Sequence, residues 1–469
     1  MANDRLAYDD LKLGEKAKEA FLAGQSPQYI KDNCAVYLNT HNHFAGLNVT
    51  DLAVAGILAG MNILLVGNTG CGKSQLARDV HNYYFNGSVR EGGHAITIEG
   101  HPELDIYRDD LTDVDREKVQ RVLNGAHKAL FWDLEEFNRC PPIAQNQFFA
   151  IGNGRLIHRG QSIPIGDKGY VSSIATANYG NGEFKGTFDV DKALENRFGL
   201  VLDLDYEQFQ PTKEDRILIA KLREAHPGIK EALRRDLTDR IIQASREISQ
   251  ATLTPGLEST AVVDFLKFGL ENCQGRDEQS PRPKGKNWPY LCQDCSRNTD
   301  GDNICSLVTT PVQRTLQSMT RYASALHYLI KLKNPEKEIN PIELMFKAFE
   351  LTSAYQNILN PAKLKADFGD EAPKMMALVA EKLKQDFRVN QDFILSSLDE
   401  ARKGNHAIDY FEADGQRGLG YDQLNDKARA KVTPLEPFND NRPIGLGWVK
   451  DAVDAEIKLA QLKKKQEGE

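Results

Sequence analysis

The chain has 469 residues, of which 41% are hydrophobic and 27% charged, with a formal net charge of -8 at pH 7. This length exceeds one compact core, so we expect two to four domains. The acidic balance argues against broad, charge-driven binding to nucleic acid, and no apolar run approaches the roughly 20 residues that span a bilayer. No apolar signal core follows the charged first residues, so we expect a cytoplasmic protein that is not embedded in a membrane.

The first half of the chain alternates between helical and strand-like patterns. Residues 1–45 read as a short helical lead-in. The run 63–66 is uniformly apolar and bounded by turn residues, as expected for a strand covered on both faces of a parallel sheet. Helical stretches separate several further strand-like runs, which predicts a doubly wound α/β sheet over residues 46–208. These runs are residues 95–98, 129–132, 173–176 and 200–204.

The pattern changes to amphipathic helices from about residue 211. This change predicts an all-α lid over residues 209–360, interrupted by an insert rich in Pro, Gly and Cys at residues 273–305. Residues 361–469 predict an α-rich C-terminal extension whose role no motif indicates.

The segment between the first predicted strand and the next helix carries the clearest chemistry. Residues 67–74 match the phosphate-loop pattern, whose glycines turn backbone N–H groups toward phosphates at a helix N-terminus. Lys73 is expected to reach the β- and γ-phosphates of ATP, and the Ser74 hydroxyl to bind Mg²⁺. A redox role for Cys71 is the weaker alternative, because this loop position is variable. The predicted nucleotide-binding residues are Gly67, Asn68, Thr69, Gly70, Cys71, Gly72, Lys73, Ser74 and Gln75.

A nucleotide site also needs a metal-holding carboxylate and a water-activating residue at the end of a neighbouring strand. The run 129–136 ends in acids, but the usual Asp-Glu pair is absent, so two registers stay open. In one, Asp133 holds Mg²⁺ and a later Glu activates water. In the other, Glu135 and Glu136 replace the pair. We expect Glu136 to be the activating base.

Several segments follow in a fixed order: residues 136–139, 141–142, 145–149, 154–157, 175–178, 182–198 and 310–314. Together they resemble the MoxR-like AAA+ ATPases of the helix-2-insert clade, and 182–198 is also similar to the ATPase subunit of cobaltochelatase. The resemblance covers about residues 46–335. Within it, 136–139 favours the register in which Glu135 and Glu136 act.

The resemblance implies a ring, most often a hexamer, that hydrolyses ATP. Asn178 would orient the attacking water or touch the γ-phosphate. Arg197 would act as an arginine finger on the next subunit's ATP, and Arg314 would reach the phosphates from the lid. Each arginine has the alternative role of a surface ion-pairing residue. Residues 96–113 would form the clade's inserted hairpin, which commonly contacts a substrate or adaptor.

The insert carries four cysteines, with two at the spacing of a metal knuckle. Cys292 and Cys295, flanked by Cys273 and Cys305, can close a tetrahedral structural Zn²⁺ site. The alternatives are free thiols or disulfides. We expect the insert on the outer surface as a partner-docking element, and its basic residues favour a solvated loop over nucleic-acid contact.

These features predict an ATPase that remodels or activates a client protein or complex, in a chaperone, assembly or metal-insertion role. Two alternatives stay open, a nucleic-acid-directed motor and an ATP-gated scaffold with weak hydrolysis. The sequence names neither the client nor the pathway.

Overall fold

The structure, a computed structural model, describes residues 5–11, 44–101, 112–115, 120–123, 126–158, 161–178, 187–188, 190–213, 216–217, 220, 235–270, 304–404 and 448–467. Contacts divide the chain into two compact units. Unit 1 comprises Met1–Leu253 and Arg321–Glu338, and unit 2 comprises Thr254–Thr320 and Ile339–Glu469.

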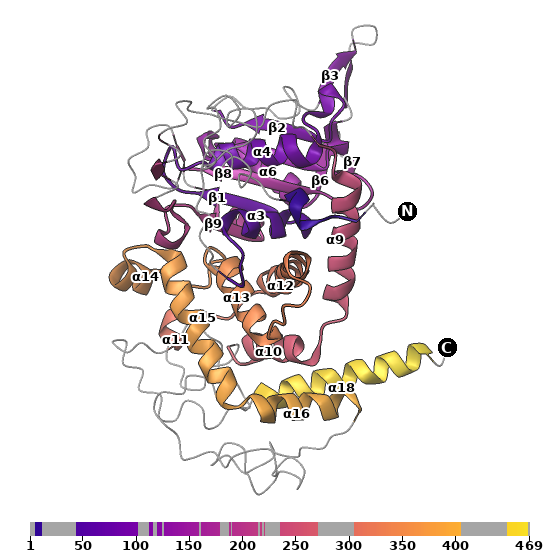
Figure 1. The fold of residues 1–469 in the computed structure, drawn as a ribbon, viewed down its shortest axis with the longest axis vertical. Helices are drawn as coiled ribbons and strands as arrows, with labels where there is room; N and C mark the ends of the chain where they lie inside the picture. Colours follow the sequence, from indigo (N-terminus) through magenta and orange to yellow (C-terminus); the bar gives the residue numbers. More distant parts are fainter. Residues whose placement is uncertain are drawn as a thin grey trace, which may run out of the picture. The chain divides into compact units, whose positions relative to one another are not determined.

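Unit 1 is built on a five-stranded sheet in the order β2-β5-β8-β1-β9, and every pairing in it is parallel (Figure 1). Its middle strands β1, β5 and β8 are buried along nearly their whole length, as apolar strands covered on both faces must be. The predicted parallel sheet of an α/β fold is therefore confirmed. The strands are β1 (Asn62–Val66), β2 (Ala95–Glu99), β5 (Phe131–Glu135), β8 (Ser172–Ala177) and β9 (Leu200–Asp203).

The strand order reverses around β1. After β1 the chain passes β8 and β5 to reach β2, and after β8 it passes β1 to reach β9. Where connections leave neighbouring strands in opposite directions, they open a crevice at the carboxyl edge of the sheet, and ligands bind there in open α/β folds. The loop that follows β1 begins at this edge.

The helices of unit 1 are held by local caps and by burial. In α3 (Val49–Leu58), the Asn48 side chain accepts a hydrogen bond from the Asp51 N–H at 2.9 Å, and Asp51 accepts one from the Asn48 N–H at 3.1 Å. This reciprocal cap satisfies two N–H groups that a helix start would otherwise leave unpaired. The other helices of this unit are α4 (Lys73–Phe85), α6 (Pro142–Gly152), α7 (Lys192–Glu195) and α9 (Thr238–Leu253), with single turns η1 (Tyr8–Leu11), η2 (Val89–Glu91), η3 (Ala126–Lys128), η4 (Phe137–Arg139) and η5 (Glu207–Phe209).

Two antiparallel hairpins accompany the sheet. One pairs β3 (Thr112–Asp115) with β4 (Gln120–Leu123), and the other pairs β6 (Arg155–His158) with β7 (Gln161–Pro164). The resemblance implied an inserted hairpin over residues 96–113, but residues 96–99 belong to the core strand β2. The hairpin starts at Thr112 and extends away from the sheet (Figure 1).

Unit 2 is helical in its described part. Its core holds aromatic rings in edge-to-face contact, with the Phe265 ring 5.4 Å from Phe387 and 5.6 Å from Trp448 between centroids. Such contacts add to the burial of apolar area. Its helices are α10 (Leu257–Phe268), α11 (Ile304–Leu307), α13 (Pro341–Ser353), α14 (Pro361–Phe368), α15 (Ala372–Val389), α16 (Gln391–Arg402) and α18 (Trp448–Glu467).

The division into units differs from the predicted lid of residues 209–360. The last part of α12 (Gln313–Lys333) groups with unit 1. There the Tyr322 hydroxyl donates to the Leu52 carbonyl at 2.8 Å, and Lys333 lies 3.6 Å from the Asp51 carboxylate. Helix α9 also packs on α3, whereas residues from 361 onward group with unit 2.

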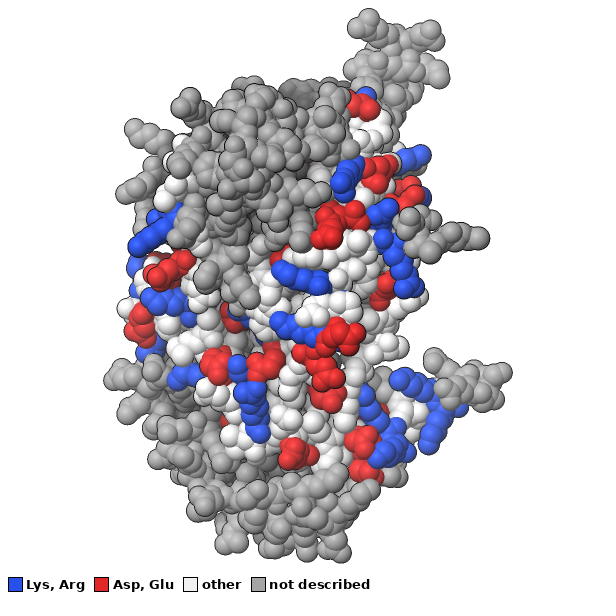
Figure 2. All heavy atoms as spheres, viewed as in Figure 1, with Lys and Arg blue, Asp and Glu red and all other residues white. Residues whose placement is uncertain are grey.

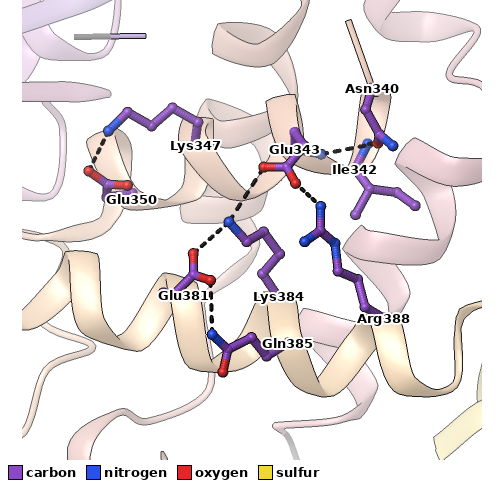
Figure 3. A network of polar contacts seen from close by, with 9 residues as sticks. All are labelled: Asn340, Ile342, Glu343, Lys347, Glu350, Glu381, Lys384, Gln385 and Arg388. Carbon is purple, nitrogen blue, oxygen red and sulfur yellow. Dashed lines mark hydrogen bonds and ion pairs between the residues drawn. The ribbon is translucent and has the colours of Figure 1, made fainter.

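A polar network fixes α13 against α15 (Figure 3). The Glu343 carboxylate accepts hydrogen bonds from Arg388 and, at 3.4 Å, from Lys384, which also pairs with Glu381 at 2.5 Å. The Asn340 side chain caps the start of α13 by accepting from the Ile342 N–H at 2.9 Å. These pairs are partly exposed, and ion pairs near the surface contribute about 0–1 kcal/mol each, so we attribute to them the register of the two helices more than their stability.

A second polar cluster in unit 2 joins α10, α16 and α18. The Arg402 guanidinium lies 3.2 Å from the Glu456 carboxylate and donates to the Thr260 hydroxyl at 2.5 Å. Beside them, Asp264 has one buried carboxyl oxygen without a hydrogen-bond partner. Burial raises the pKa of Asp264 to about 8; Glu456 raises it too, and Arg402 opposes the rise.

We expect Asp264 to make stability fall as the pH rises. Because its folded pKa of about 8 exceeds the ordinary value of 3.8, the folded chain keeps a proton that the unfolded chain releases, and each step in pH between these values favours unfolding. The melting temperature of the wild type should therefore drop more between pH 6 and pH 8.5 than that of Asp264→Asn. The exposed Asp454→Asn on the same helical group serves as control, and an equal drop in all three proteins would contradict the assignment.

Candidate functional site

The candidate site begins with the loop between β1 and α4. Gly67 directly follows β1, and Gly72 caps the start of α4. Three loop glycines have positive φ angles, +137° at Gly67, +82° at Gly70 and +94° at Gly72. L-residues are strained in this region, so the glycines are required by the backbone conformation itself. Asn68, Thr69 and Gly70 are exposed, so the outer part of the loop is open to solvent.

Lys73, the first residue of α4, folds back into this loop. Its ammonium group donates to the carbonyls of Gly67 and Asn68, each at 2.7 Å, and lies 3.5 Å from the Cys71 sulfur. The lysine is buried, while Ser74 behind it is half-buried. A fixed ammonium group, a helix N-terminus and a glycine-rich turn together favour binding of an anion.

Cys71 of the loop and Gln75 of α4 have local roles. Burial raises the pKa of the Cys71 thiol despite the opposing charge of Lys73, so the thiol stays protonated and poorly nucleophilic. Gln75 is buried and donates to Asp79 at 3.0 Å, one turn further along α4.

The two acids of β5 point to the same face of the sheet, because they are two residues apart on one strand. Asp133 is fully buried and accepts a hydrogen bond from the Thr97 hydroxyl at 3.4 Å. Burial raises its pKa well above the ordinary value, and Glu135 raises it further. Glu135 ends the strand, where both of its oxygens accept from Arg78, at 2.7 and 2.9 Å.

The pairing with Arg78 relates Glu135 to the loop. Arg78 stands four residues after Ser74 on α4, and residues at this spacing share a helix face. Glu135 therefore lies along the face of α4 that carries Ser74. Asp133 is held elsewhere, at the Thr97 hydroxyl, which itself lies 3.0 Å from His81 Nδ1.

Glu136 adopts a left-handed conformation with φ +48° directly after β5. Such a conformation costs about 1–3 kcal/mol for most residues and persists only where the surroundings hold it. Here the Glu136 N–H donates to the Thr176 hydroxyl of β8 at 2.8 Å. Gly100 lies so close to the Glu136 backbone that an added Cβ would stand 2.3 Å from its carbonyl oxygen. The Glu136 carboxylate pairs with Arg139 at 2.5 Å.

Asn178 follows β8 and is tied to η4. Asn138 donates from its side chain to the Asn178 carbonyl at 3.0 Å and accepts from the Asn178 N–H at 3.4 Å. Because β5, β8 and β1 are neighbours and parallel, the carboxyl ends of these three strands meet at one edge. Lys73, Glu135, Glu136 and Asn178 all stand at that edge.

Arg197 stands at the other end of β1. Asn62, the first residue of β1, donates from its side chain to the carbonyls of Gly152 at 3.1 Å and Arg197 at 3.4 Å. A strand of this length spans about 15 Å, so Arg197 is remote from the phosphate loop of its own chain. Arg314 is exposed on the first turn of α12 and belongs to unit 2.

The predicted Zn²⁺ site falls almost entirely outside the described residues. Cys273, Cys292 and Cys295 lie outside them, and only the backbone of Cys305 is described, in α11. Over the described ranges, no group of three His, Cys, Asp or Glu side chains is arranged to hold a metal ion. Over the same ranges, no helix is both long and apolar enough for a bilayer.

The sequence did not single out two residues that contact the site. Arg78 could have been found from its spacing to Ser74. Asp205 could not, because it reaches the loop only through the pairing of β9 with β1. Its carboxylate accepts a hydrogen bond from the Asn68 N–H at 2.7 Å and thereby ties down the base of the loop.

No family model and no curated protein matches the chain. Among solved structures, the chain is similar to the crystal structure of an inferred ATPase from Cytophaga hutchinsonii. The two are 15% identical, the match covers 70% of this chain and 87% of that chain, and the TM-score is 0.47.

Asp205→Ala should loosen the loop. It removes the charged acceptor of the Asn68 N–H, a hydrogen bond worth about 1 kcal/mol at a partly exposed position, so hydrogen exchange at Asn68 should speed up about fivefold. Mass spectrometry on the peptide that contains Asn68 measures this change. Asp205→Asn keeps an acceptor oxygen, so its exchange rate at Asn68 should lie between those of the wild type and Asp205→Ala. An unchanged rate in Asp205→Ala would show that the contact does not order the loop.

Proposed function

We propose that this chain is an ATP-hydrolysing AAA+ ring ATPase of the MoxR-like type, which remodels or activates a client protein. The observation that carries the proposal is the loop of residues 67–74, with its three left-handed glycines and the inward-folded ammonium group of Lys73. It starts at the carboxyl end of β1, where the strand order reverses, and the predicted acids lie at the carboxyl end of β5, which β8 separates from β1.

The residues present fit a magnesium nucleotide. Lys73 and the loop N–H groups supply positive charge for phosphates, and Ser74 and Glu135 supply the hard oxygen ligands that Mg²⁺ prefers. The bound nucleotide supplies the phosphoanhydride bond, with Mg²⁺ neutralising part of its charge. We assign the metal-holding role to Glu135 because it lies along the Ser74 face of α4, whereas Asp133 is fully buried and its raised pKa favours the protonated form.

We assign the proton-accepting role to Glu136. Its backbone is held by Thr176 and Gly100, and this fixes the position of its Cα relative to the end of β5. In this role Glu136 takes a proton from the attacking water, which Asn178 orients from the end of β8. General-base catalysis of this kind contributes about 10²–10⁴-fold to a rate.

Arg197 fits action in trans. It lies at the amino end of β1, away from its own loop, so it completes the pocket of the next protomer in a homo-oligomeric ring, which we propose is a hexamer. For Arg314 we propose the nucleotide-sensing role that the resemblance implies. The four insert cysteines, Cys273, Cys292, Cys295 and Cys305, remain a proposed structural Zn²⁺ site. We also propose a cytoplasmic location for the protein.

A protein client is favoured over nucleic acid by the charge distribution. On the face in Figure 2, the Lys and Arg side chains of the described residues alternate with Asp and Glu and form no continuous basic stripe. The net charge of -8 agrees with this. Stimulation of hydrolysis by DNA or RNA would favour a nucleic-acid motor, and binding without turnover would favour a scaffold.

Lys73→Ala should abolish tight nucleotide binding. It removes the one ammonium group inside the loop, and charged hydrogen bonds to phosphate are worth about 1.5–3 kcal/mol each, so the Kd for ADP should rise at least tenfold. Titration with a fluorescent ADP analogue measures this. Lys128→Ala, an exposed lysine of the same unit, is the control. Equal affinity in the wild type and both variants would refute the proposal.

Glu136→Gln should bind ATP normally but hydrolyse it on the order of 100-fold more slowly, since the amide cannot accept the proton. Steady-state phosphate release and nucleotide titration separate the two effects. Asp133→Asn should leave hydrolysis within a few fold of the wild type. If Asp133→Asn is inactive and Glu136→Gln is active, the correct register is the one in which Asp133 holds Mg²⁺ and a different Glu activates water.

A further inference from the structure

The pair of Arg78 and Glu135 joins the phosphate-loop helix to the strand that carries the acids. The guanidinium group donates from Nε and from one terminal nitrogen to the two oxygens of Glu135, at 2.7 and 2.9 Å. This fork geometry is the strongest form of a carboxylate–arginine pair. It engages both oxygens of the carboxylate that we assign to Mg²⁺.

Arg78 serves more than one acid. Glu99 is the partner of Glu135 across the β2–β5 pairing, and Asp133 stands two residues earlier on the same face. All three carboxyl groups interact electrostatically with the Arg78 guanidinium, and its hydrogen bonds to Glu135 are the main cause that raises the pKa of Arg78. Among the described residues, Arg78 thus supplies positive charge to the acids at this edge of β2 and β5.

The two partners differ in their freedom to move. The Glu135 side chain is 7% exposed, whereas the Arg78 side chain is 48% exposed. An arginine this exposed can turn its head group into water at low cost, while the carboxylate stays near the strand. Ser74 lies one turn before Arg78 on the same face of α4, so Glu135 stands between two possible cation positions.

We propose that Arg78 is a resident counter-ion that competes with Mg²⁺ for Glu135 and is displaced when a magnesium nucleotide binds. The proposal rests on the proposed function. A metal ion beside Ser74 needs an oxygen of Glu135 that the guanidinium now engages, and the two cations repel each other at this distance. Filling of the phosphate loop is thereby linked to the release of Arg78 from β5, and nucleotide without metal leaves the pair intact.

If Arg78 oriented Glu135 instead of competing for it, its removal would change the affinity for Mg²⁺ in the opposite direction. Carboxylates that bind metals are often oriented by a hydrogen-bond donor, and if Arg78 only oriented Glu135, its removal would weaken the metal. The measurement that separates the roles is the Mg²⁺ dependence of nucleotide affinity, which needs no turnover. It is the ratio of the Kd of ADP in EDTA to that in saturating Mg²⁺, determined by calorimetry.

Under competition, Arg78→Gln raises this ratio on the order of tenfold above that of the wild type, equivalent to about 1.4 kcal/mol of relieved competition. Arg78→Lys keeps the charge but loses the two-nitrogen contact. Its ratio therefore lies between those of the wild type and Arg78→Gln. In a Glu135→Gln background, Arg78→Gln has no effect on the ratio. Arg90→Gln, an exposed arginine of the same unit, is the matched control and behaves like the wild type.

A ratio that is unchanged or lower in Arg78→Gln overturns the competition. Circular dichroism checks that each variant folds, and Arg78→Lys carries the comparison if Arg78→Gln does not. If the wild type binds ADP and Lys73→Ala does not, an unchanged ratio refutes only the role of Arg78. If the wild type binds ADP in neither condition, the proposed function and the role of Arg78 both fail.

Discussion

The ammonium group of Lys73, held by two carbonyls of its own loop, is the contact on which the rest of the site depends. A buried ammonium is costly unless hydrogen bonds compensate it, and the loop can offer its carbonyls only because glycines let it turn through left-handed conformations. The loop in turn begins where β1 ends and closes where α4 starts. One cation therefore links the middle of the sheet, the turn and the first turn of a helix.

The negative charge opposite this cation is divided among acids in unlike surroundings. Asp133 is deep in the sheet and has a raised pKa, Glu135 is paired with an arginine, and Glu136 stands on a strained backbone beside Arg139. Such a separation of environments lets neighbouring carboxyl groups take different roles. In the proposed function, this difference in surroundings is the reason that we assign the roles to the outer two acids and not to the buried Asp133.

Unit 2 contains a cluster of ionisable side chains between its helices. Arg402 and Glu456 pair next to Asp264, whose pKa is raised, and the Phe265 ring of α10 contacts the rings of Phe387 and Trp448. A polar cluster inside a helical group lowers stability unless each member is satisfied, and it favours one arrangement of the helices over others. We regard the cluster as a determinant of how α18 docks on α10 and α16.

The sequence by itself determined the local parts of this protein. Residues 63–66 had to form a buried strand because they are apolar throughout. The glycines after them indicated a turn with positive φ angles, which glycine adopts without strain. Boundaries were less well determined. The acids 133 and 135 were expected after the strand, yet β5 includes them, because pairing with β2 on one side and β8 on the other extends it.

Only the tertiary structure decided which distant residues meet. The order β2-β5-β8-β1-β9 brings Thr176 to Glu136, Arg78 to Glu135 and Asp205 to the loop, and it moves Arg197 to the far end of β1. Spacing along the chain places Arg78 on the Ser74 face of α4 but gives none of these contacts, because strand order is set by how crossover helices pack on both faces of a sheet. Local conformation came from residue chemistry, and the composition of the site came from packing.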